Sequence, residues 1–335
     1  MKVLELYSGI GGMHFAFEES GIEGCISMAA EINPIANEVY KYNFPDTDLS
    51  GRNIQGLTPD VINKMNINLI LMSPPCQPFT RNGNFGDDED PRSDSFIHIL
   101  SMIKDLKDLN YILIENVKGF EKSNTRNFLK KTLEEANFTY QEFILSPLQF
   151  GIPNSRHRYY CLAKKNSLES DFTPNVIKTN LNIDTAEPFP LKDILEENIV
   201  VNDYELQEKQ LCKYIKVLDI CYKDSNRSCC FTKAYGRYLD GTGSVFCPIS
   251  EETANNILKE AKNTGVSIEN LKRLQLRYFT PKEISRLMCF PEKFNFPPSI
   301  TTKQRYRLLG NSINIKVVSL LIRLLINNSL ESIKS

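Results

Sequence analysis

The chain has 335 residues, of which 41% are hydrophobic and 24% are charged, and its formal net charge is -1 at pH 7. That length and apolar share can build one large domain and a second, smaller one. A net charge near zero excludes a protein that coats nucleic acid non-specifically, so any nucleic-acid partner must be held by a local patch.

Cysteine usage and hydropathy indicate a soluble protein of a reducing compartment. The nine cysteines are an odd number, include no Cys-x-x-Cys pair and are accompanied by only three histidines. This pattern fits neither a disulfide framework nor a zinc site. No apolar run approaches the roughly 20 residues that a membrane-spanning helix needs. We therefore expect no metal and no membrane partner.

Short apolar runs alternate with helical periodicity through the first half of the chain. Strands alternating with helices favour a parallel sheet with helices on both faces. The predicted fold class is therefore α/β, Rossmann-like, with a second, smaller domain. In chain order, the sequence predicts a strand at 3–7, a helix at 13–20, a strand at 25–31, a helix at 36–42, a strand at 69–73, a helix at 96–106, and strands at 111–115, 140–145 and 159–163.

The sequence changes in character after Lys164, where prolines are scattered through a polar stretch without clear periodicity. This change predicts a domain boundary. Helices are expected at 204–218 and 251–262, and a strongly apolar helix at 317–326 follows a turn signal at Gly310-Asn311. A helix this apolar must pack against another part of the protein, and we expect it to pack against the sheet of the first domain. The predicted domains are 1–164, completed by 281–335, and 165–280.

A glycine turn, Ser8-Gly9-Ile10-Gly11-Gly12, follows the first predicted strand. Missing side chains let a ligand approach the backbone at a helix start. His14 replaces the third glycine of the dinucleotide fingerprint, and Glu31, at the end of the next strand, can accept hydrogen bonds from ribose hydroxyls. Each feature alone could be a tight connection or a solvated carboxylate. Together they predict an adenosine-containing ligand without a pyrophosphate, such as S-adenosylmethionine.

Three prolines surround Cys76 in the run Ser73-Pro74-Pro75-Cys76-Gln77-Pro78. Prolines restrict the backbone, so they hold this thiol in one place beyond the end of a strand. A thiol held there could be a nucleophile, and the structural alternative is a buried, inert cysteine. The glycine-rich and charged residues 81–90 indicate a loop that closes over a substrate, or a plain surface loop.

Glu115 ends the predicted strand next to the one that leads to Cys76. A carboxyl group beside the ring nitrogen and exocyclic amine of a pyrimidine makes carbon 6 more electrophilic toward a thiolate. Arg156 and Arg158 share one face if their segment is extended, and two guanidinium groups suit a phosphate or a base carbonyl. Solvated strand ends are the alternative for these charged residues. We predict catalytic roles for Cys76, Glu115, Arg156 and Arg158.

Five motifs in this order resemble the cytosine-5 methyltransferase family, and they span nearly the whole chain. They are Gly9-Ile10-Gly11-Gly12, Pro74-Pro75-Cys76, Glu115-Asn116-Val117, Arg156-His157-Arg158 and Gly310-Asn311-Ser312. Three further stretches resemble the type-2 branch, which methylates an anticodon-loop cytosine of tRNA, mainly of tRNA-Asp. These stretches are Leu71-Met72-Ser73, Ile152-Pro153-Asn154-Ser155-Arg156, and Cys230-Phe231-Thr232 followed by Tyr235-Gly236-Arg237-Tyr238.

The resemblance implies a class I S-adenosylmethionine-dependent methyltransferase fold with a smaller target-recognition domain. It also implies that Cys76 adds to carbon 6 of a flipped-out cytosine while Glu115 contacts the ring. Residues 279–291 would steady the smaller domain. Cofactor contacts are expected from Tyr7, Ser8, Gly9, Gly11, Gly12, Glu31, Ile32, Ile54, Pro75, Asn311 and Ser312, and substrate contacts from Arg81, Cys230, Phe231, Thr232 and Tyr235.

Two other interpretations stay open. A DNA (cytosine-5) methyltransferase would share every catalytic motif, and a non-catalytic nucleic-acid-binding protein could keep the pocket without the chemistry. Intact Cys76 and Glu115 argue against the second. Whether Cys229 or its neighbour Cys230 has a role is left open. We expect a monomer that acts on tRNA in the cytoplasm, the nucleus or both.

Overall fold

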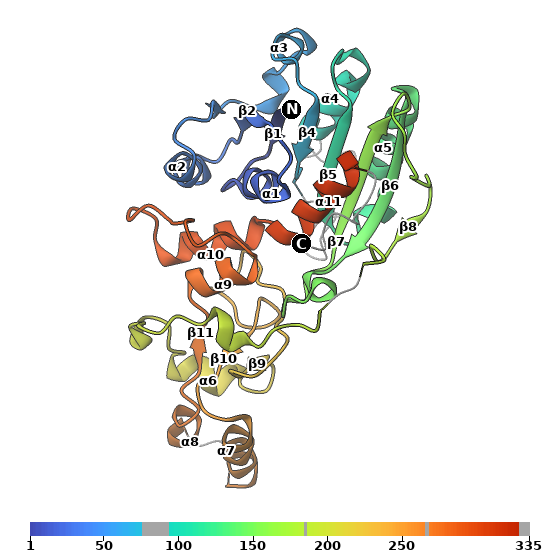
Figure 1. The fold of residues 1–335 in the computed structure, drawn as a ribbon. Helices are drawn as coiled ribbons and strands as arrows, with labels where there is room; N and C mark the ends of the chain where they lie inside the picture. The colour runs from blue at the N-terminus through green and yellow to red at the C-terminus, as the bar shows by residue number, and fades with distance from the viewer. Residues whose placement is uncertain (76–93, 184–185, 265–267, 328–335) are drawn as a thin grey trace. The chain divides into compact units, whose positions relative to one another are not determined.

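The computed structural model describes residues 1–75, 94–183, 186–264 and 268–327 (Figure 1). It divides into two compact units. Unit 1 comprises Met1–Leu145, His157–Asp184 and Ile315–Ser335, and unit 2 comprises Ser146–Arg156 and Thr185–Asn314. Two of the predicted site residues, Cys76 and Arg81, lie outside the described residues.

Unit 1 is built on an eight-stranded sheet with the strand order β3-β2-β1-β4-β5-β7-β6-β8. The sheet is mostly parallel, and β7 runs antiparallel to both of its neighbours. This arrangement confirms the predicted α/β fold class. The strands are β1 (Lys2–Leu6), β2 (Cys25–Ala30), β3 (Leu49–Ser50), β4 (Leu69–Met72), β5 (Tyr111–Val117), β6 (Phe138–Leu145), β7 (Arg158–Lys165) and β8 (Ile177–Lys178).

Helices cover both faces of this sheet because alternate residues of its buried strands point to opposite sides. Leu4 and Leu6 of β1 pack in one cluster with residues of α4 and α5. On the other face α11 packs against β5, β7 and α1, and Figure 1 shows α1 and α11 side by side. The helices are α1 (Gly12–Ser20), α2 (Pro34–Asn43), α3 (Pro59–Lys64), α4 (Asp94–Met102), α5 (Asn124–Glu135) and α11 (Ile315–Asn327).

The apolar helix predicted at 317–326 is α11, and eight of its residues from Ile315 to Leu325 are buried. Among the described residues, Thr302–Asn327 is the one stretch long and apolar enough to cross a membrane by length and composition alone. In this structure 72% of its most apolar window is buried. Such burial is expected of helices that pack into a protein core, and α11 packs on the sheet as predicted.

Unit 2 has a small three-stranded sheet, in the order β11-β10-β9, surrounded by short helices. Its strands are β9 (Ile220–Cys221), β10 (Val245–Phe246) and β11 (Arg277–Tyr278). Its helices are α6 (Glu208–Tyr214), α7 (Glu251–Thr264), α8 (Ile268–Lys272), α9 (Pro281–Leu287) and α10 (Thr302–Asn311).

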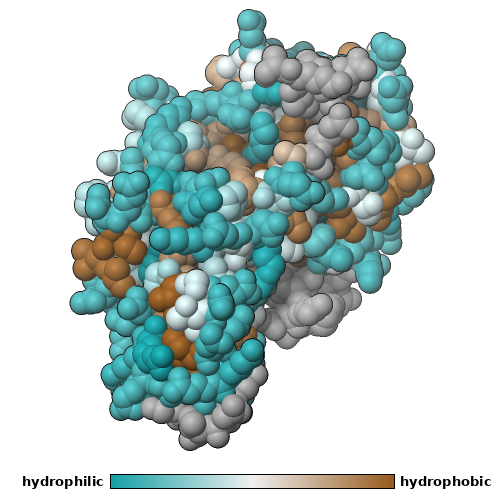
Figure 2. All heavy atoms as spheres, turned by 60° about the horizontal axis from the view of Figure 1, so that its bottom comes forward, coloured by the Kyte–Doolittle hydropathy of each residue, from teal (hydrophilic) through white to brown (hydrophobic). Residues whose placement is uncertain are grey.

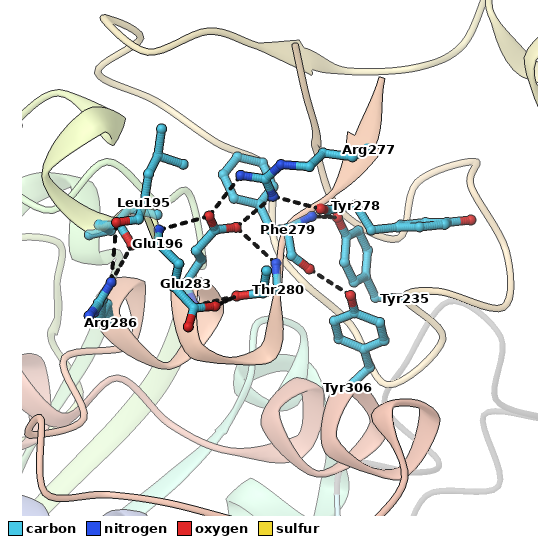
Figure 3. Close-up of polar contacts among 11 residues, drawn as sticks. Leu195, Glu196, Tyr235, Arg277, Tyr278, Phe279, Thr280, Glu283, Arg286 and Tyr306 are labelled. Carbon is cyan, nitrogen blue, oxygen red and sulfur yellow. Dashed lines mark hydrogen bonds and ion pairs between the residues drawn. The ribbon is translucent and has the colours of Figure 1, made fainter. Parts of the chain in front are cut away.

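A buried ion pair fastens α9 to the small sheet of unit 2 (Figure 3). Glu283 accepts hydrogen bonds from both terminal guanidinium nitrogens of Arg277 at 2.8 Å, from Thr280 N at 2.8 Å and from Glu196 N at 3.1 Å. A buried charge is tolerated only when its lone pairs are satisfied in this way. The network supports the expectation that residues 279–291 steady the smaller unit.

The observed bounds of the two units differ from the predicted ones. Unit 1 continues past 164 because β8 adds an edge strand beside β6. Residues 281–314 were expected in the larger domain but belong to unit 2, because the Glu283 network holds α9 to β11. Residues 146–156 also join unit 2, where Asn154 Nδ2 donates hydrogen bonds to Ser228 Oγ and the Cys229 carbonyl at 3.0 Å.

The surface seen in Figure 2 is mostly hydrophilic, and hydrophobic side chains appear in separate small areas. The large hydrophobic residues exposed among the described ones include Ile32, Tyr42, Val200 and Tyr238. Scattered exposed apolar groups are normal on folded proteins. Two of these four residues belong to candidate binding surfaces: Ile32 lies next to Glu31 in unit 1, and Tyr238 lies in unit 2.

Candidate active site

The glycine turn after β1 has one packed side and one open side. Tyr7, Gly9 and Gly11 have φ values of 57°, 54° and 85°, a left-handed backbone that glycine adopts without strain. A Cβ on Gly11 would lie 2.6 Å from the Phe44 ring, whereas one on Gly9 would meet no atom of the described residues within 4 Å. The turn is therefore backed by α2 at Gly11 and open to a ligand at Gly9.

Glu31 fixes the shape of this open side. Its carboxylate accepts hydrogen bonds from Gly9 N at 3.0 Å and from Asn33 N at 2.8 Å. These bonds join the end of β2 to the turn after β1. Because each carboxylate oxygen can accept more than one hydrogen bond, Glu31 can still receive ribose hydroxyls.

The described residues around the turn fit an adenosine-containing ligand. The Ser8 hydroxyl is buried and has no hydrogen-bond partner among the residues that the structure describes. A buried hydroxyl without a partner is costly, and a polar ligand could satisfy it. Ile32 is 68% exposed next to Glu31, where its apolar surface could cover a flat base. Ile54 is buried in the hydrophobic core of unit 1, and Pro75 is exposed.

The ends of β1, β4 and β5 are tied together directly before Cys76. Ser73 Oγ donates a hydrogen bond to the Tyr7 carbonyl at 3.3 Å, and Asn116 Nδ2 donates one to the Pro74 carbonyl at 3.4 Å. The parallel pairing of β4 with β5 places Met72 beside Ile114, so both strands end at the same edge. Cys76 itself is not described, but the residues that lead to it start from the edge that carries Glu115.

Glu115 and Arg158 form an ion pair at this edge. Arg158 Nε lies 3.3 Å from Glu115 Oε1, and the two side chains are only 16% and 10% exposed. Arg158 is the first residue of β7, which pairs antiparallel with β5. The antiparallel register thus brings the Arg158 guanidinium to the Glu115 carboxylate. Little solvent is present there to screen the attraction between the two charges. This pair provides a fixed charged group for a polar ring at the strand ends.

Arg156 has different contacts from Arg158, although the sequence suggested that the two share a face. It is buried in unit 2, where its guanidinium donates to the carbonyls of Phe231 at 3.0 Å, Gly310 at 3.1 Å, and Ser312. Alternation of faces holds only within a strand, and β7 begins at Arg158. Arg156 therefore joins the segment at Phe231 to the C-terminal end of α10, and its catalytic role stays a prediction.

The predicted substrate contacts in unit 2 divide into buried and accessible residues. Phe231 and Tyr235 are 3% and 2% exposed, and their rings pack edge to face with centroids 4.9 Å apart. Their burial argues against direct contact with a substrate. Cys230 and Thr232 are partly exposed, and Cys230 Sγ lies 3.4 Å from Arg156 Nη1. Cys229, its neighbour, is exposed.

Asn311 and Ser312 were predicted to approach the cofactor. Asn311 is exposed at the end of α10, and Ser312 follows as its half-buried cap residue. Both belong to unit 2, so their approach to the glycine turn stays a prediction. The structural contribution of Asn116 was missed, although it lies inside the Glu-Asn-Val motif. A polar residue in a buried strand end was the signal available in the sequence.

The sheet, the open glycine turn and the acidic residue at the end of β2 fit the class of S-adenosylmethionine-dependent methyltransferases. A family model described as C-5 cytosine-specific DNA methylase matches residues 1–327, and the chain belongs to this family. Members of this family use S-adenosylmethionine as the methyl donor. The chain is accordingly an enzyme, a cytosine-5 methyltransferase.

Known proteins are similar over nearly the full length of the chain. A tRNA (cytosine(38)-C(5))-methyltransferase of Spodoptera frugiperda is 52% identical over 97% of this chain and 98% of its own. The Homo sapiens protein of the same name is 43% identical over 97% of this chain and 99% of its own. A crystal structure of a Spodoptera frugiperda DNMT2 mutant superposes with a TM-score of 0.90 at 52% identity and covers 97% of this chain and 99% of that one.

Proposed function

We propose that this enzyme methylates carbon 5 of a cytosine in the anticodon loop of a tRNA, specifically tRNA-Asp. The similarity to two tRNA (cytosine(38)-C(5))-methyltransferases over 97% of the chain carries the RNA part of the proposal. The absence of an overall positive charge also favours a substrate held by a local patch over a long duplex. A nucleotide in a loop is also less costly to extrude than a stacked base pair.

In the proposed mechanism, the thiolate of Cys76 adds to carbon 6 of the extruded cytosine. Glu115 holds the ring nitrogen and the exocyclic amine, which draws electron density from carbon 6. Arg158, 3.3 Å from Glu115, keeps that carboxyl group oriented. S-adenosylmethionine, when bound, supplies the methyl group to carbon 5. Loss of the carbon 5 proton then expels the Cys76 thiolate and leaves 5-methylcytosine.

The chain's own residues would position the methyl donor. The Ser8 hydroxyl, the open side at Gly9 and the Glu31 carboxylate lie together at the end of β1 and β2. Hydrogen bonds from Ser73 to Tyr7 and from Asn116 to Pro74 connect this place to the strand ends that lead to Cys76 and Glu115. These connections are the structural observation that supports a methyl transfer at one shared edge.

The substrate assignment is tested with labelled S-adenosylmethionine. The enzyme is incubated with a tRNA pool, with a tRNA-Asp transcript and with duplex DNA of the same sequence, and the methylated base is located by bisulfite sequencing. We expect one methylated cytosine in the anticodon loop of tRNA-Asp. A transcript with uracil at that position is the control. Label that appears in the DNA alone would replace the proposal with a DNA (cytosine-5) methyltransferase.

The covalent step is tested separately with Cys76→Ala. We expect methyl transfer by this variant to fall at least about 10⁴-fold, because an essential nucleophile is removed. Incorporation of 5-fluorocytosine at the target should trap a covalent complex with the wild type only. Equal methyl transfer by the two proteins would rule out the Cys76 adduct, and a protein that binds RNA without any transfer would be the non-catalytic alternative.

A further inference from the structure

Residues 232–242 of unit 2 form a closed loop on a buried aromatic base. Thr232 N donates to the Thr242 carbonyl at 2.9 Å, and Thr242 Oγ1 donates to the Tyr238 carbonyl at 2.5 Å. The Tyr235 hydroxyl, inside the loop, donates to the Ser244 carbonyl at 2.7 Å. Because these hydrogen bonds hold both ends of the loop, the loop is a rigid support for its exposed side chains.

The aromatic base continues beneath the loop into α10 and β11 (Figure 3). The ring centroids of Tyr235 and Tyr306 lie 5.0 Å apart, and the Tyr306 hydroxyl donates to the Phe279 carbonyl at 2.6 Å. Gly236 has a φ of 76°, and a Cβ there would lie 2.7 Å from the Tyr306 ring. The backbone at Gly236 therefore rests directly on α10, which fixes the position of the next two residues.

Those next two residues, Arg237 and Tyr238, are exposed and stacked on each other. Tyr238 is 52% exposed, and the Arg237 guanidinium carbon lies 5.0 Å from the centre of its ring. The neighbouring tyrosine of the same loop, Tyr235, is almost fully buried. Stacking on a cation reduces the freedom of the exposed ring. The result is a flat aromatic surface with a positive charge beside it.

A basic stripe on α10 borders this loop. Lys303, Arg307 and Gly310 are spaced i, i+4, i+7, so they lie along one side of the helix. A Cβ on Gly310 would lie 2.2 Å from Lys233 N, which shows that the loop backbone touches this same side. Lys233, Lys303 and Arg307 are exposed. The loop and the side of α10 that borders it thus carry four exposed cations, Lys233, Arg237, Lys303 and Arg307, together with one exposed acid of the loop, Asp240.

We propose that the Arg237-Tyr238 stack is a platform for an unpaired nucleobase of the RNA substrate, and that Lys233, Lys303 and Arg307 hold the adjoining phosphates. Unpaired bases stack on exposed aromatic rings and on guanidinium planes, and cations beside them follow the backbone. Duplex DNA offers phosphates but no unstacked base. This surface therefore selects single-stranded loops over duplexes. The inference rests on the proposed action on tRNA and names the residues that recognise the loop.

The platform is tested with Tyr238→Ala and Tyr238→Phe in the full chain. We expect Tyr238→Ala to raise both the KM and the Kd for tRNA about 10-fold, the loss expected for one stacked base. Its KM for S-adenosylmethionine should stay at the wild-type value, and so should its melting temperature, because the ring is exposed. Tyr238→Phe should remain within about twofold of wild type, because stacking uses the ring and not the hydroxyl.

A matched control is Tyr42→Ala, which removes a tyrosine of α2 that is 56% exposed. This variant should leave the KM for tRNA unchanged. If Tyr238→Ala methylates tRNA with wild-type KM, the platform is refuted while the proposed function stands. Equal losses of tRNA and duplex DNA binding would also refute it, because the surface would then bind any polyanion. If wild-type enzyme methylates no RNA at all, the proposed function fails, irrespective of Tyr238.

Discussion

Glu115 keeps its carboxylate beside Arg158 in a place that is almost closed to solvent. We expect Glu115→Gln to lower kcat at least about 100-fold. Glutamine has the same shape as glutamate, but its amide cannot carry the negative charge or the exchangeable proton of a carboxyl group. The measurement is methyl transfer to tRNA at saturating substrate. Glu135→Gln, which changes a carboxylate of α5 that is 64% exposed, is the matched control. An unchanged kcat for Glu115→Gln would remove Glu115 from the mechanism.

A second buried carboxyl group lies behind the glycine turn. Glu5 accepts hydrogen bonds from His14 N at 3.2 Å and from the Tyr40 hydroxyl at 2.8 Å, and the His14 ring stacks on Phe44. Burial raises the pKa of Glu5 from 4.5 to about 8, although these hydrogen bonds lower it and nearby Glu31 adds to the rise. Glu5 therefore keeps its proton at neutral pH, unlike an exposed carboxyl group.

This raised pKa has a predictable effect on stability. Between pH 4.5 and about 8 the folded protein holds a proton on Glu5 that the unfolded chain releases, so the free energy of unfolding falls as pH rises through this range. The glutamine of Glu5→Gln is neutral at every pH. The melting temperature of this variant should therefore rise relative to that of wild type from pH 5 to pH 8. Melting temperatures of both proteins across this range measure the effect. Parallel curves would show that Glu5 is not protonated in the folded state.

At the scale of elements, the contact between α10 and residues 232–233 depends on a glycine. We expect Gly310→Ala to destabilise the protein by about 1–3 kcal/mol, because the new methyl group would meet backbone atoms that cannot move aside. Thermal unfolding and protease sensitivity of unit 2 measure this loss. Gly56→Ala is the control, because a Cβ there meets nothing within 4 Å in the part of the chain that the structure describes. Similar melting temperatures for both variants would mean that the loop can shift away from α10.

The elements that could be predicted from sequence were those with strong apolar patterns. β1, β4 and β5 are runs of buried residues, and α11 is apolar over most of its length, so each was located within a few residues. α5 was missed because only three of its twelve residues are buried and most of the rest are polar. Burial of this helix comes from its neighbours, which a local pattern does not contain.

Site residues that lie at strand ends could be located from the sequence. The exposure of a site residue was harder to predict where it depends on contacts with residues distant in sequence. The link between Glu31 and Gly9 follows from two neighbouring parallel strands that end at one edge. Tyr235 was expected to contact the substrate, but it is buried, while Tyr238, three residues later, is exposed. Which of two nearby tyrosines faces solvent is decided by contacts with Tyr306 and Phe279, distant in sequence.

At the scale of the whole molecule, a net charge of -1 limits how many phosphates the enzyme can hold. If Lys233, Lys303 and Arg307 make the main phosphate contacts, the logarithm of the tRNA affinity should fall against the logarithm of salt concentration with a slope of about -2. Lys303→Gln with Arg307→Gln should reduce this slope by about 1.4. Lys131→Gln with Lys209→Gln, two exposed lysines elsewhere, should leave it unchanged. A slope that the first pair does not alter would place the phosphates elsewhere.

The chain passes between the two units four times, and its last described helix, α11, returns to the sheet that β1 began. The part of that sheet's face at β5 and β7, where α11 packs, therefore remains uncovered during synthesis until more than 300 residues have left the ribosome. Until then the apolar side chains of this part of the sheet face water or a chaperone, and the larger unit cannot complete its hydrophobic core. Shortening the chain before Ile315 should thus yield insoluble protein rather than a smaller working enzyme.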